Sequence, residues 1–347
     1  MKNFYVLLFI FLFNVVKAQT IDVVTGLNRP IGLIFNGGEL YISEFGANKI
    51  SKIDTASDSP TVVNVVTDVY NPLGLIFIGN ELYFTQQSEN KVSKIDISSN
   101  NPIIIDVALG INRATYFALN GSDLYVSSQT DGKISKIDTT LNPPTVVDVV
   151  TGLFYPSGLL IFNDELYIAD YGANKILKID LSSANPITTD VVTGLNNPTA
   201  LALNGNDLYI SEYTTNKIIK IDITNPSNSV EDVVTDLNGP SGLVFKNNEL
   251  YISEDFGNKV SKIDISSLSI NEYLNKKSLV LYPNPAKHTI KILGLEFNKN
   301  YEIFNVLGSK IKSGIISNQE EIDISNLISG FYIFKLENGD SLKFFKE

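Results

Sequence analysis

A 42-residue repeat governs most of this chain. A tetrad of the Asp-Val-Val-Thr type recurs six times at this spacing, beginning at Asp22, Asn64, Asp106, Asp148, Asp190 and Asp232. A Leu-Tyr pair and a Lys-Ile-Asp ending keep the same spacing, without any insertion. A fixed period of this length indicates stacked supersecondary units. The chain is therefore expected to fold as an array of six similar units.

Each repeat contains four short segments with the composition of β-strands. In the first repeat, β-branched and aromatic residues at 30–36, 39–43, 49–54 and 61–66 are separated by Gly, Asn and Pro turns. The segments lack the periodicity of an amphipathic helix. Four strands per repeat, repeated six times, predict an all-β fold with a six-bladed β-propeller.

The two ends of the array complement one another. It begins with the strand at 21–25 but stops after the strand that ends at Asp264, so the last repeat lacks its outer strand. Pairing residues 21–25 with the last repeat would satisfy both open edges. We therefore predict a propeller over residues 19–268 that is closed into a ring by its N-terminal strand.

The amino terminus has the pattern of an export signal. Lys2 precedes an apolar run at 4–13, and Val16-Lys17-Ala18 offers a site for signal peptidase. The run is shorter than the about 20 apolar residues that a membrane-spanning helix needs. We expect a signal peptide over residues 1–18 and no transmembrane segment in the mature protein, which we expect to be a monomer.

Composition excludes several classes of function. The chain has 27 Lys and Arg against 38 Asp and Glu, a net charge of −11, so nucleic-acid binding is not expected. It has no cysteine, which removes disulfides, thiolate nucleophiles and thiolate metal sites. The one histidine, His288, lies outside the repeats and is expected to be a surface residue.

The repeat resembles two known kinds of propeller repeat. Residues 30–33 (Pro-Ile-Gly-Leu), 39–44 (Glu-Leu-Tyr-Ile-Ser-Glu) and 48–50 (Asn-Lys-Ile) are similar to the NHL repeat and to the repeat of virginiamycin B lyase. The resemblance implies a six-bladed ring whose loops before the innermost strand and after the second strand share one face. That lyase family works with a histidine and magnesium. Because no histidine stands between Gln19 and Ser278, its activity is not carried over.

The carboxyl-terminal segment follows a different pattern. After an expected linker at 269–278, residues 279–347 are similar throughout to the type A sorting domain of the type IX secretion system, for example at 278–287 (Ser-Leu-Val-Leu-Tyr-Pro-Asn-Pro-Ala-Lys). Their short strands and turns predict a small β-sandwich. The resemblance implies a bacterium of the Bacteroidetes, transit through the periplasm and export by the type IX machinery. It further implies removal of the domain, with the mature protein secreted or attached to the outer cell surface.

One glycine position differs between repeats in an informative way. It carries Gly32, Gly74, Tyr116, Gly158, Ala200 and Gly242. Glycine fits where inner strands crowd an axis and another backbone approaches closely. Two interpretations of Tyr116 stay open: its ring plugs the axial channel, or it lines a funnel and stacks on a ligand.

The residue that ends the second strand also varies between repeats. It is Glu44, Gln86, Ser128, Asp170, Glu212 or Glu254. Four carboxylates on one face would repel one another unless a cation lay between them, and an all-oxygen site selects calcium or magnesium. Gluconolactonase-type propellers hold a metal at this place, which makes a hard-cation site one interpretation of these residues. Alternatively, each carboxylate caps the following turn or pairs with a nearby lysine.

The second and third repeats offer neutral polar groups instead. Gln86 and Gln129, beside Arg113 and Tyr116, suit a sugar or a peptide better than a metal, although drift in a tolerant loop would produce the same pattern. We expect a binding or interaction module whose glycan, peptide or protein ligand lies over the axial funnel. The alternatives are a divalent-cation-dependent lactonase- or lyase-like enzyme that uses the four carboxylates, and a purely structural surface protein.

Overall fold

The computed structural model describes residues 20–57, 59–225, 229–266, 279–295, 298–306, 308–337 and 341–347. The expected signal peptide (1–18) and the expected linker (269–278) lie outside these residues. The chain divides into two compact units, Met1–Ile265 and Ser266–Glu347, and each is described by itself. Among the described residues, no helix is long and apolar enough to cross a bilayer.

The first unit consists of four-stranded antiparallel sheets that follow the repeat. Sheet 1 contains β2 (Pro30–Asn36), β3 (Glu39–Glu44), β4 (Lys49–Asp54) and β5 (Val63–Thr67), with a short 3₁₀ helix η1 (Phe45–Ala47) between β3 and β4. Sheet 2 contains β6 (Pro72–Ile78), β7 (Glu81–Gln86), β8 (Lys91–Asp96) and β9 (Ile105–Leu109). Sheet 3 contains β10 (Ala114–Asn120), β11 (Asp123–Ser128), β12 (Lys133–Asp138) and β13 (Val146–Thr151).

The remaining three repeats continue this order. Sheet 4 contains β14 (Pro156–Phe162), β15 (Glu165–Asp170), β16 (Lys175–Asp180) and β17 (Thr189–Thr193). Sheet 5 contains β18 (Pro198–Asn204), β19 (Asp207–Glu212), β20 (Lys217–Asp222) and β21 (Glu231–Val234). Sheet 6 contains β22 (Pro240–Lys246), β23 (Glu249–Glu254) and β24 (Lys259–Asp264), and its fourth strand is β1 (Ile21–Thr25).

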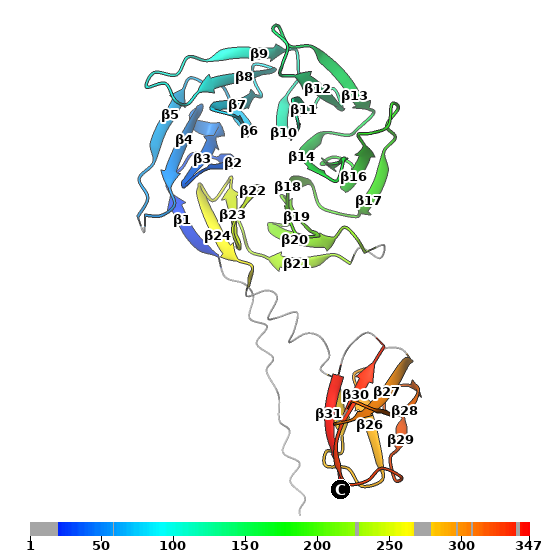
Figure 1. Ribbon diagram of the computed structural model, residues 1–347. Helices are drawn as coiled ribbons and strands as arrows, with labels where there is room; N and C mark the ends of the chain where they lie inside the picture. The colour runs from blue at the N-terminus through cyan, green and yellow to red at the C-terminus, as the bar shows by residue number, and fades with distance from the viewer. Residues whose placement is uncertain are drawn as a thin grey trace, which may run out of the picture. The chain divides into compact units, whose positions relative to one another are not determined.

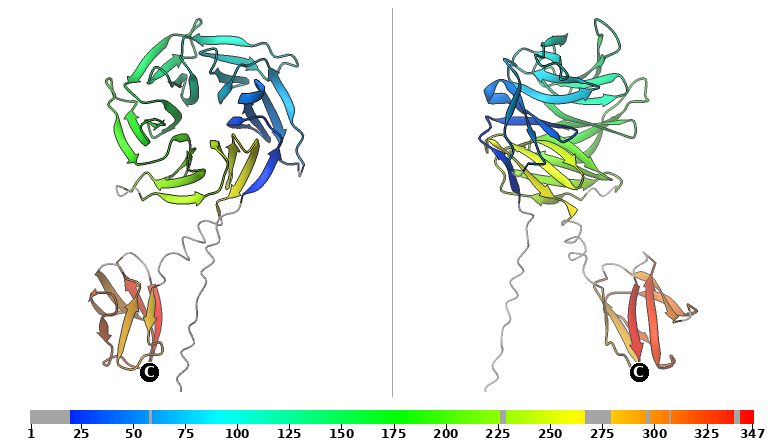
Figure 2. Two further views of the ribbon diagram at one scale, coloured as in Figure 1. Left: turned by 180° about the vertical axis from the view of Figure 1, so that it is seen from behind. Right: turned by 60° about the vertical axis from the view of Figure 1, so that its left-hand side comes forward.

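The sheets surround a common centre (Figure 1). Their first strands contact one another in the order β2, β6, β10, β14, β18 and β22, and β22 contacts β2 in turn; Figure 2 shows the same order from behind. At the junction of the two chain ends, β1 pairs with β24, and Val24 lies opposite Val260. The register of β1 shifts between Asp22 and Val24, as it does in the outer strands of the other sheets.

Two sequence expectations can be compared directly with these strands. The first three strands of the first repeat start where the sequence predicts, whereas the fourth starts at Val63 rather than at residue 61. The glycines of the inner strands lie in close approach to the next strand. A Cβ on Gly32 would collide with the carbonyl oxygen of Leu73, and one on Gly242 with that of Ile31. The crowding predicted for this position is confirmed.

Hydroxyl groups connect the inner strands of neighbouring sheets at five of the six junctions. Ser253 accepts a hydrogen bond from the N–H of Gly242 (2.6 Å) and donates one to the carbonyl oxygen of Ile31 (2.6 Å). Ser43, Thr85, Ser127 and Ser211 make the equivalent pair of bonds, while sheet 4 has Ala169 at this position. Buried backbone groups need such partners, so these hydroxyls join neighbouring sheets. We call them the hydroxyl belt.

Apolar side chains fill the space between neighbouring sheets. Between sheets 6 and 1, one cluster contains Val24, Val260 and Tyr251 from sheet 6 together with Leu40 and Ile42 from sheet 1. Burying a side chain of this size stabilises a fold by about 1.5–3 kcal/mol. The junction between the first and last repeats is therefore packed like those between consecutive repeats.

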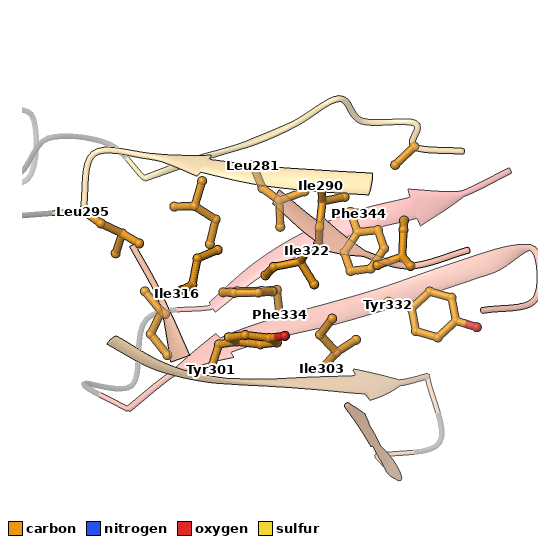
Figure 3. Packing of buried hydrophobic residues seen from close by; sticks show 14 residues of the cluster. Leu281, Ile290, Leu295, Tyr301, Ile303, Ile316, Ile322, Tyr332, Phe334 and Phe344 are labelled. Carbon is orange, nitrogen blue, oxygen red and sulfur yellow. The ribbon is translucent and has the colours of Figure 1, made fainter. Parts of the chain in front are cut away.

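The second unit contains two sheets. One has the order β25 (Val280–Tyr282), β26 (Thr289–Leu293) and β29 (Glu321–Asp323). The other has the order β28 (Lys310–Ile316), β27 (Lys299–Asn305), β30 (Gly330–Leu336) and β31 (Ser341–Lys346). Residues from both sheets, including Ile290, Tyr301 and Phe334, form one buried core (Figure 3). This arrangement agrees with the β-sandwich predicted for the segment.

Candidate binding face

Two sets of loops lie at the same end of every sheet, because an inner strand begins where the second strand of its sheet ends. In sheet 1 these are the loop before β2 and the turn after β3, joined by a hydrogen bond from the N–H of Phe45 to the carbonyl oxygen of Arg29 (3.0 Å). We call this end of the first unit, with residues 26–29, 45–48 and their counterparts in the other repeats, the loop face.

Asparagines in left-handed backbone conformation fix the loops of this face. Asn48, at φ 52°, accepts a hydrogen bond from the N–H of Asn71 in the next repeat (2.9 Å). Asn258 does the same for Arg29 (3.0 Å), so the contact also links the last repeat to the first. Asparagine is tolerated in this conformation better than other residues with a Cβ. The loops are therefore positioned by the neighbouring sheet as well as by their own.

The six residues at the ends of the second strands are all buried. Each of the four carboxylates accepts a hydrogen bond from the backbone N–H of the residue 16 positions earlier, in the loop before the inner strand. Glu44 also accepts from Ser51 (2.7 Å) and lies 3.2 Å from the Lys49 ammonium. Glu212 and Glu254 have similar lysine partners, Lys217 and Lys259. These carboxylates hold their own loops in place.

The structure does not bring Glu44, Asp170, Glu212 and Glu254 together. They belong to four different sheets, and within the described ranges no group of three or more acidic or histidine side chains lies close enough to hold a metal ion. The contacts of Glu44, Glu212 and Glu254 agree with the interpretation that these carboxylates pair with nearby lysines. The backbone N–H groups that the carboxylates accept from belong chiefly to the loop before the inner strand, not to the turn after the second strand. Burial raises the pKa of the Asp170 carboxyl above its usual value, an effect that backbone hydrogen bonds partly offset.

Of the candidate ligand-binding residues in the second and third repeats, some are buried and others lie at the surface. Gln86 is buried, accepts from the N–H of Tyr70 (3.0 Å) and donates to Ser93 (2.9 Å), so it replaces a carboxylate in the same structural role. Arg113 is exposed, and its guanidinium lies 3.4 Å from the side-chain oxygen of Gln87. Gln129 is half-buried on the same face. Gln86 is therefore not available at the surface, whereas Arg113 is.

Tyr116 reaches across the common centre of the sheets. Its hydroxyl lies 3.3 Å from the hydroxyl of Ser241 on β22, three sheets away in the cyclic order. Burial raises the pKa of Tyr116 from 10.0 to about 12. A side chain that spans the axis in this way matches the plug interpretation.

A buried aspartate organises one side of the loop face. Asp255 is 1% exposed and accepts two hydrogen bonds from the Arg29 guanidinium, at 2.8 and 2.9 Å. The hydroxyl of Tyr213 donates a third (2.7 Å). The hydrogen bond with Asp255 raises the pKa of Arg29, and burial together with Asp255 raises that of Tyr213. Bidentate pairs of this kind fix geometry as well as charge.

Aromatic side chains extend from this cluster across sheets 1, 6, 5 and 4. The Arg29 guanidinium lies 4.8 Å from the centre of the Phe45 ring and 5.8 Å from that of Phe256. The rings of Phe256 and Tyr213 are 5.6 Å apart, and those of Phe154 and Tyr155 are 5.0 Å apart. We call this series the aromatic arc; its members are Phe45, Phe154, Tyr155, Tyr171, Tyr213 and Phe256.

Comparison of the repeats did not single out the aromatic arc or Asp255, although the residue types at two loop positions indicate them. The position after the second-strand carboxylate carries Phe45, Gln87, Gln129, Tyr171, Tyr213 and Asp255. Only one member is acidic, and only two loops carry arginine at the position of Arg29. A charged residue that occurs in one repeat only, such as Asp255, is not needed by the shared architecture. It indicates an ion pair specific to that repeat, here the pair with Arg29.

Comparison with known proteins identifies the second unit. Residues 280–346 match the model of the secretion system C-terminal sorting domain. This part of the chain is thus the sorting domain that its sequence predicts, and it indicates export to the cell surface or secretion. A search of curated proteins gives no match to the chain.

Solved structures resemble the first unit in fold. A catalytically inactive virginiamycin B lyase from Staphylococcus aureus, solved with quinupristin, is 19% identical and covers 72% of this chain and 99% of its own (TM-score 0.55). A putative gluconolactonase is 13% identical and covers 72% of this chain and 92% of its own (TM-score 0.60). A luciferin-regenerating enzyme is 14% identical and covers 71% and 95% (TM-score 0.59). The first unit shares the β-propeller fold of these structures.

Proposed function

We propose that this protein is a secreted or cell-surface binding module. On this proposal, residues 19–268 form a six-bladed propeller closed by β1, and the type IX secretion machinery exports the protein through residues 279–347. The pairing of β1 with β24 and the contact of β22 with β2 support the closed ring. The sorting domain supports the export route.

The aromatic arc is the observation that carries the binding role. The side chains of Phe154 and Phe256 are each 57% exposed, although large aromatic rings are normally buried. Both belong to loop-face segments. The Phe256 ring lies 5.6 Å from the Tyr213 ring and packs on Gly239, whose N–H donates to Asn216 of the preceding repeat (2.9 Å). Exposed aromatic residues on a fixed surface are typical of binding sites. We therefore place the ligand on the loop face, over the ring centre that Tyr116 crosses.

The alternative function is a divalent-cation-dependent lactonase- or lyase-like enzyme that uses Glu44, Asp170, Glu212 and Glu254. A cation that bound these side chains would have to displace the backbone N–H groups and lysines that occupy them. Thermal unfolding in calcium, in magnesium and in a chelator distinguishes the two. The binding proposal predicts the same melting temperature in all three, and a rise of several degrees with either cation would favour the enzyme.

An array of oligosaccharides and peptides tests the binding role. The purified full chain is expected to retain ligands of at least one class, and the Phe154→Ala/Phe256→Ala double variant is expected to lose them. Ile187→Ala is a matched control, because this residue is 80% exposed on the same unit but lies in the segment that leads into the outer strand β17, outside the loop-face segments. Absence of any ligand, or equal retention by the double variant, would contradict the proposal.

A further inference from the structure

We infer that the ligand of the loop face is an uncharged carbohydrate chain, an inference that rests on the proposed binding function. Its first support is where exposed apolar side chains lie on the propeller. Among the described residues of the first unit, the exposed large aromatics are Tyr70, Phe154, Tyr155 and Phe256, all in loop-face segments. The exposed aliphatics lie in the outer strands or the segments that lead into them: Ile21, Val63, Ile103, Ile105, Leu109, Leu141, Val146, Val147, Ile187 and Val230.

This separation favours a sugar over a peptide. The face of an aromatic ring carries partial negative charge, and the C–H groups on one side of a pyranose ring carry partial positive charge, so the two attract when stacked. Aliphatic side chains lack this ring charge. A surface that binds apolar peptide side chains has use for both kinds of residue, whereas the large exposed apolar residues within the loop-face segments are aromatic.

The rings are held ready for stacking. Phe256 packs on Gly239, where a Cβ would lie 2.9 Å from the ring, and Phe154 packs in the same way on Gly172. The Arg29 guanidinium further fixes Phe256, and the Asp255 carboxylate fixes Arg29. Because these side chains are already ordered, little conformational entropy is lost when a ligand binds. Rigid, exposed rings suit a ligand that offers flat apolar patches.

The charges of the face favour a neutral ligand. Beside the aromatic arc, Asp255 neutralises Arg29 in a bidentate pair. In the loops of sheet 3, the exposed Arg113 contacts Gln87 (3.4 Å), and the carboxylate of Asp131, which accepts from Asn112 (2.8 Å) and Ser128 (2.9 Å), supplies the opposite charge. The side-chain amides of Gln87 and Gln129 stand at the same loop position as Tyr171 and can exchange hydrogen bonds with sugar hydroxyls. An acidic polysaccharide would also be repelled by the net charge of −11.

Affinity electrophoresis of the full chain tests the ligand class. Gels contain laminarin, glucomannan or starch as neutral polysaccharides, or alginate as an acidic one, and hydrolysed casein is added as a peptide competitor. We expect retardation by at least one neutral polysaccharide, none by alginate, and no effect of casein peptides. Phe154→Ala and Phe256→Ala should each weaken retardation about tenfold, while Ile187→Ala should leave it unchanged. Circular dichroism verifies that every variant is folded.

The outcomes separate this inference from the function on which it rests. No retardation by any of the neutral polysaccharides overturns the carbohydrate inference. If peptides or alginate bind instead and Phe256→Ala abolishes that binding, the ligand class is wrong but the binding module stands. If nothing binds, in these gels or on the array, both proposals fail. Retardation that both ring variants retain also overturns the inference, because it would place the sugar elsewhere.

Discussion

At the scale of single residues, Tyr116 shows how one departure from a repeat changes the centre of the ring. Four of the six repeats have glycine at its position, since the carbonyl oxygen of the next inner strand would collide with a side chain. Tyr116 instead reaches the hydroxyl of Ser241 across the centre. The side chain of Tyr116 therefore connects sheets 3 and 6, which share no strand pairing.

Tyr116 predicts a specific dependence of stability on pH. Its pKa is raised to about 12 in the folded protein, so between pH 10 and pH 12 the unfolded chain loses this proton while the folded chain keeps it. The folded state is therefore destabilised as pH rises through this window. In urea unfolding at pH 8 and at pH 11.5, the stability of the natural protein relative to Tyr116→Phe should fall at the higher pH. A difference that stays constant would contradict the assigned burial of this hydroxyl.

At this scale the sequence pointed to positions that vary between repeats, but it could not predict their partners. Comparison of repeats singled out Tyr116 and the six ends of the second strands, because both vary where the architecture is otherwise constant. It could not predict that Ser241, 125 positions away, would meet Tyr116, since this depends on how far apart the inner strands lie across their common centre. The four carboxylates lie near the start of the inner strands, where loop N–H groups bind them.

At the scale of elements, the hydroxyl belt explains why the second strand of most repeats carries serine or threonine after its Leu-Tyr-x segment. Each hydroxyl satisfies an N–H of its own sheet and a carbonyl of the next. The repeat made this position visible, but its purpose emerges only when neighbouring sheets are placed side by side. Ala169 shows that one junction can form without it.

Replacement of Ser253 tests the belt. Ser253→Ala leaves the N–H of Gly242 and the carbonyl of Ile31 buried without this partner, and each such group costs about 1–3 kcal/mol. We expect a loss of about 2 kcal/mol in the free energy of unfolding by urea. Ser253→Thr is the matched control, since Thr85 makes the same bonds in sheet 2, and it should lose less than half as much. Equal losses would show that side-chain size, not the hydroxyl, matters here.

At the scale of the whole molecule, the ends of the repeat array determine the architecture. The spare strand at the amino terminus and the missing strand in the last repeat were visible in the sequence, and the pairing of β1 with β24 follows from them. The aromatic arc depends on this arrangement, because Arg29 from the first repeat contacts Asp255 and Phe256 from the last. A ring that did not close would separate these residues.

A disulfide across the junction tests this arrangement most directly. Val24 and Val260 are buried Cα partners on β1 and β24, and facing residues of antiparallel strands are close enough for a disulfide. The chain has no cysteine, so in Val24→Cys/Val260→Cys only this pair can form. Val24→Cys/Ile134→Cys, which joins sheets 6 and 3, serves as the control.

Oxidation of the purified Val24→Cys/Val260→Cys variant, followed by a non-reducing gel, gives the decisive result. A ring closed by β1 predicts a monomer that migrates faster than its reduced form, with an unchanged circular dichroism spectrum, and no such band from the control pair. On the loop-entropy account, the bond should also stabilise the protein by about 5 kcal/mol. A variant that stays reduced, or that forms only disulfide-linked dimers, would contradict closure and with it the shared face on which the proposed binding depends.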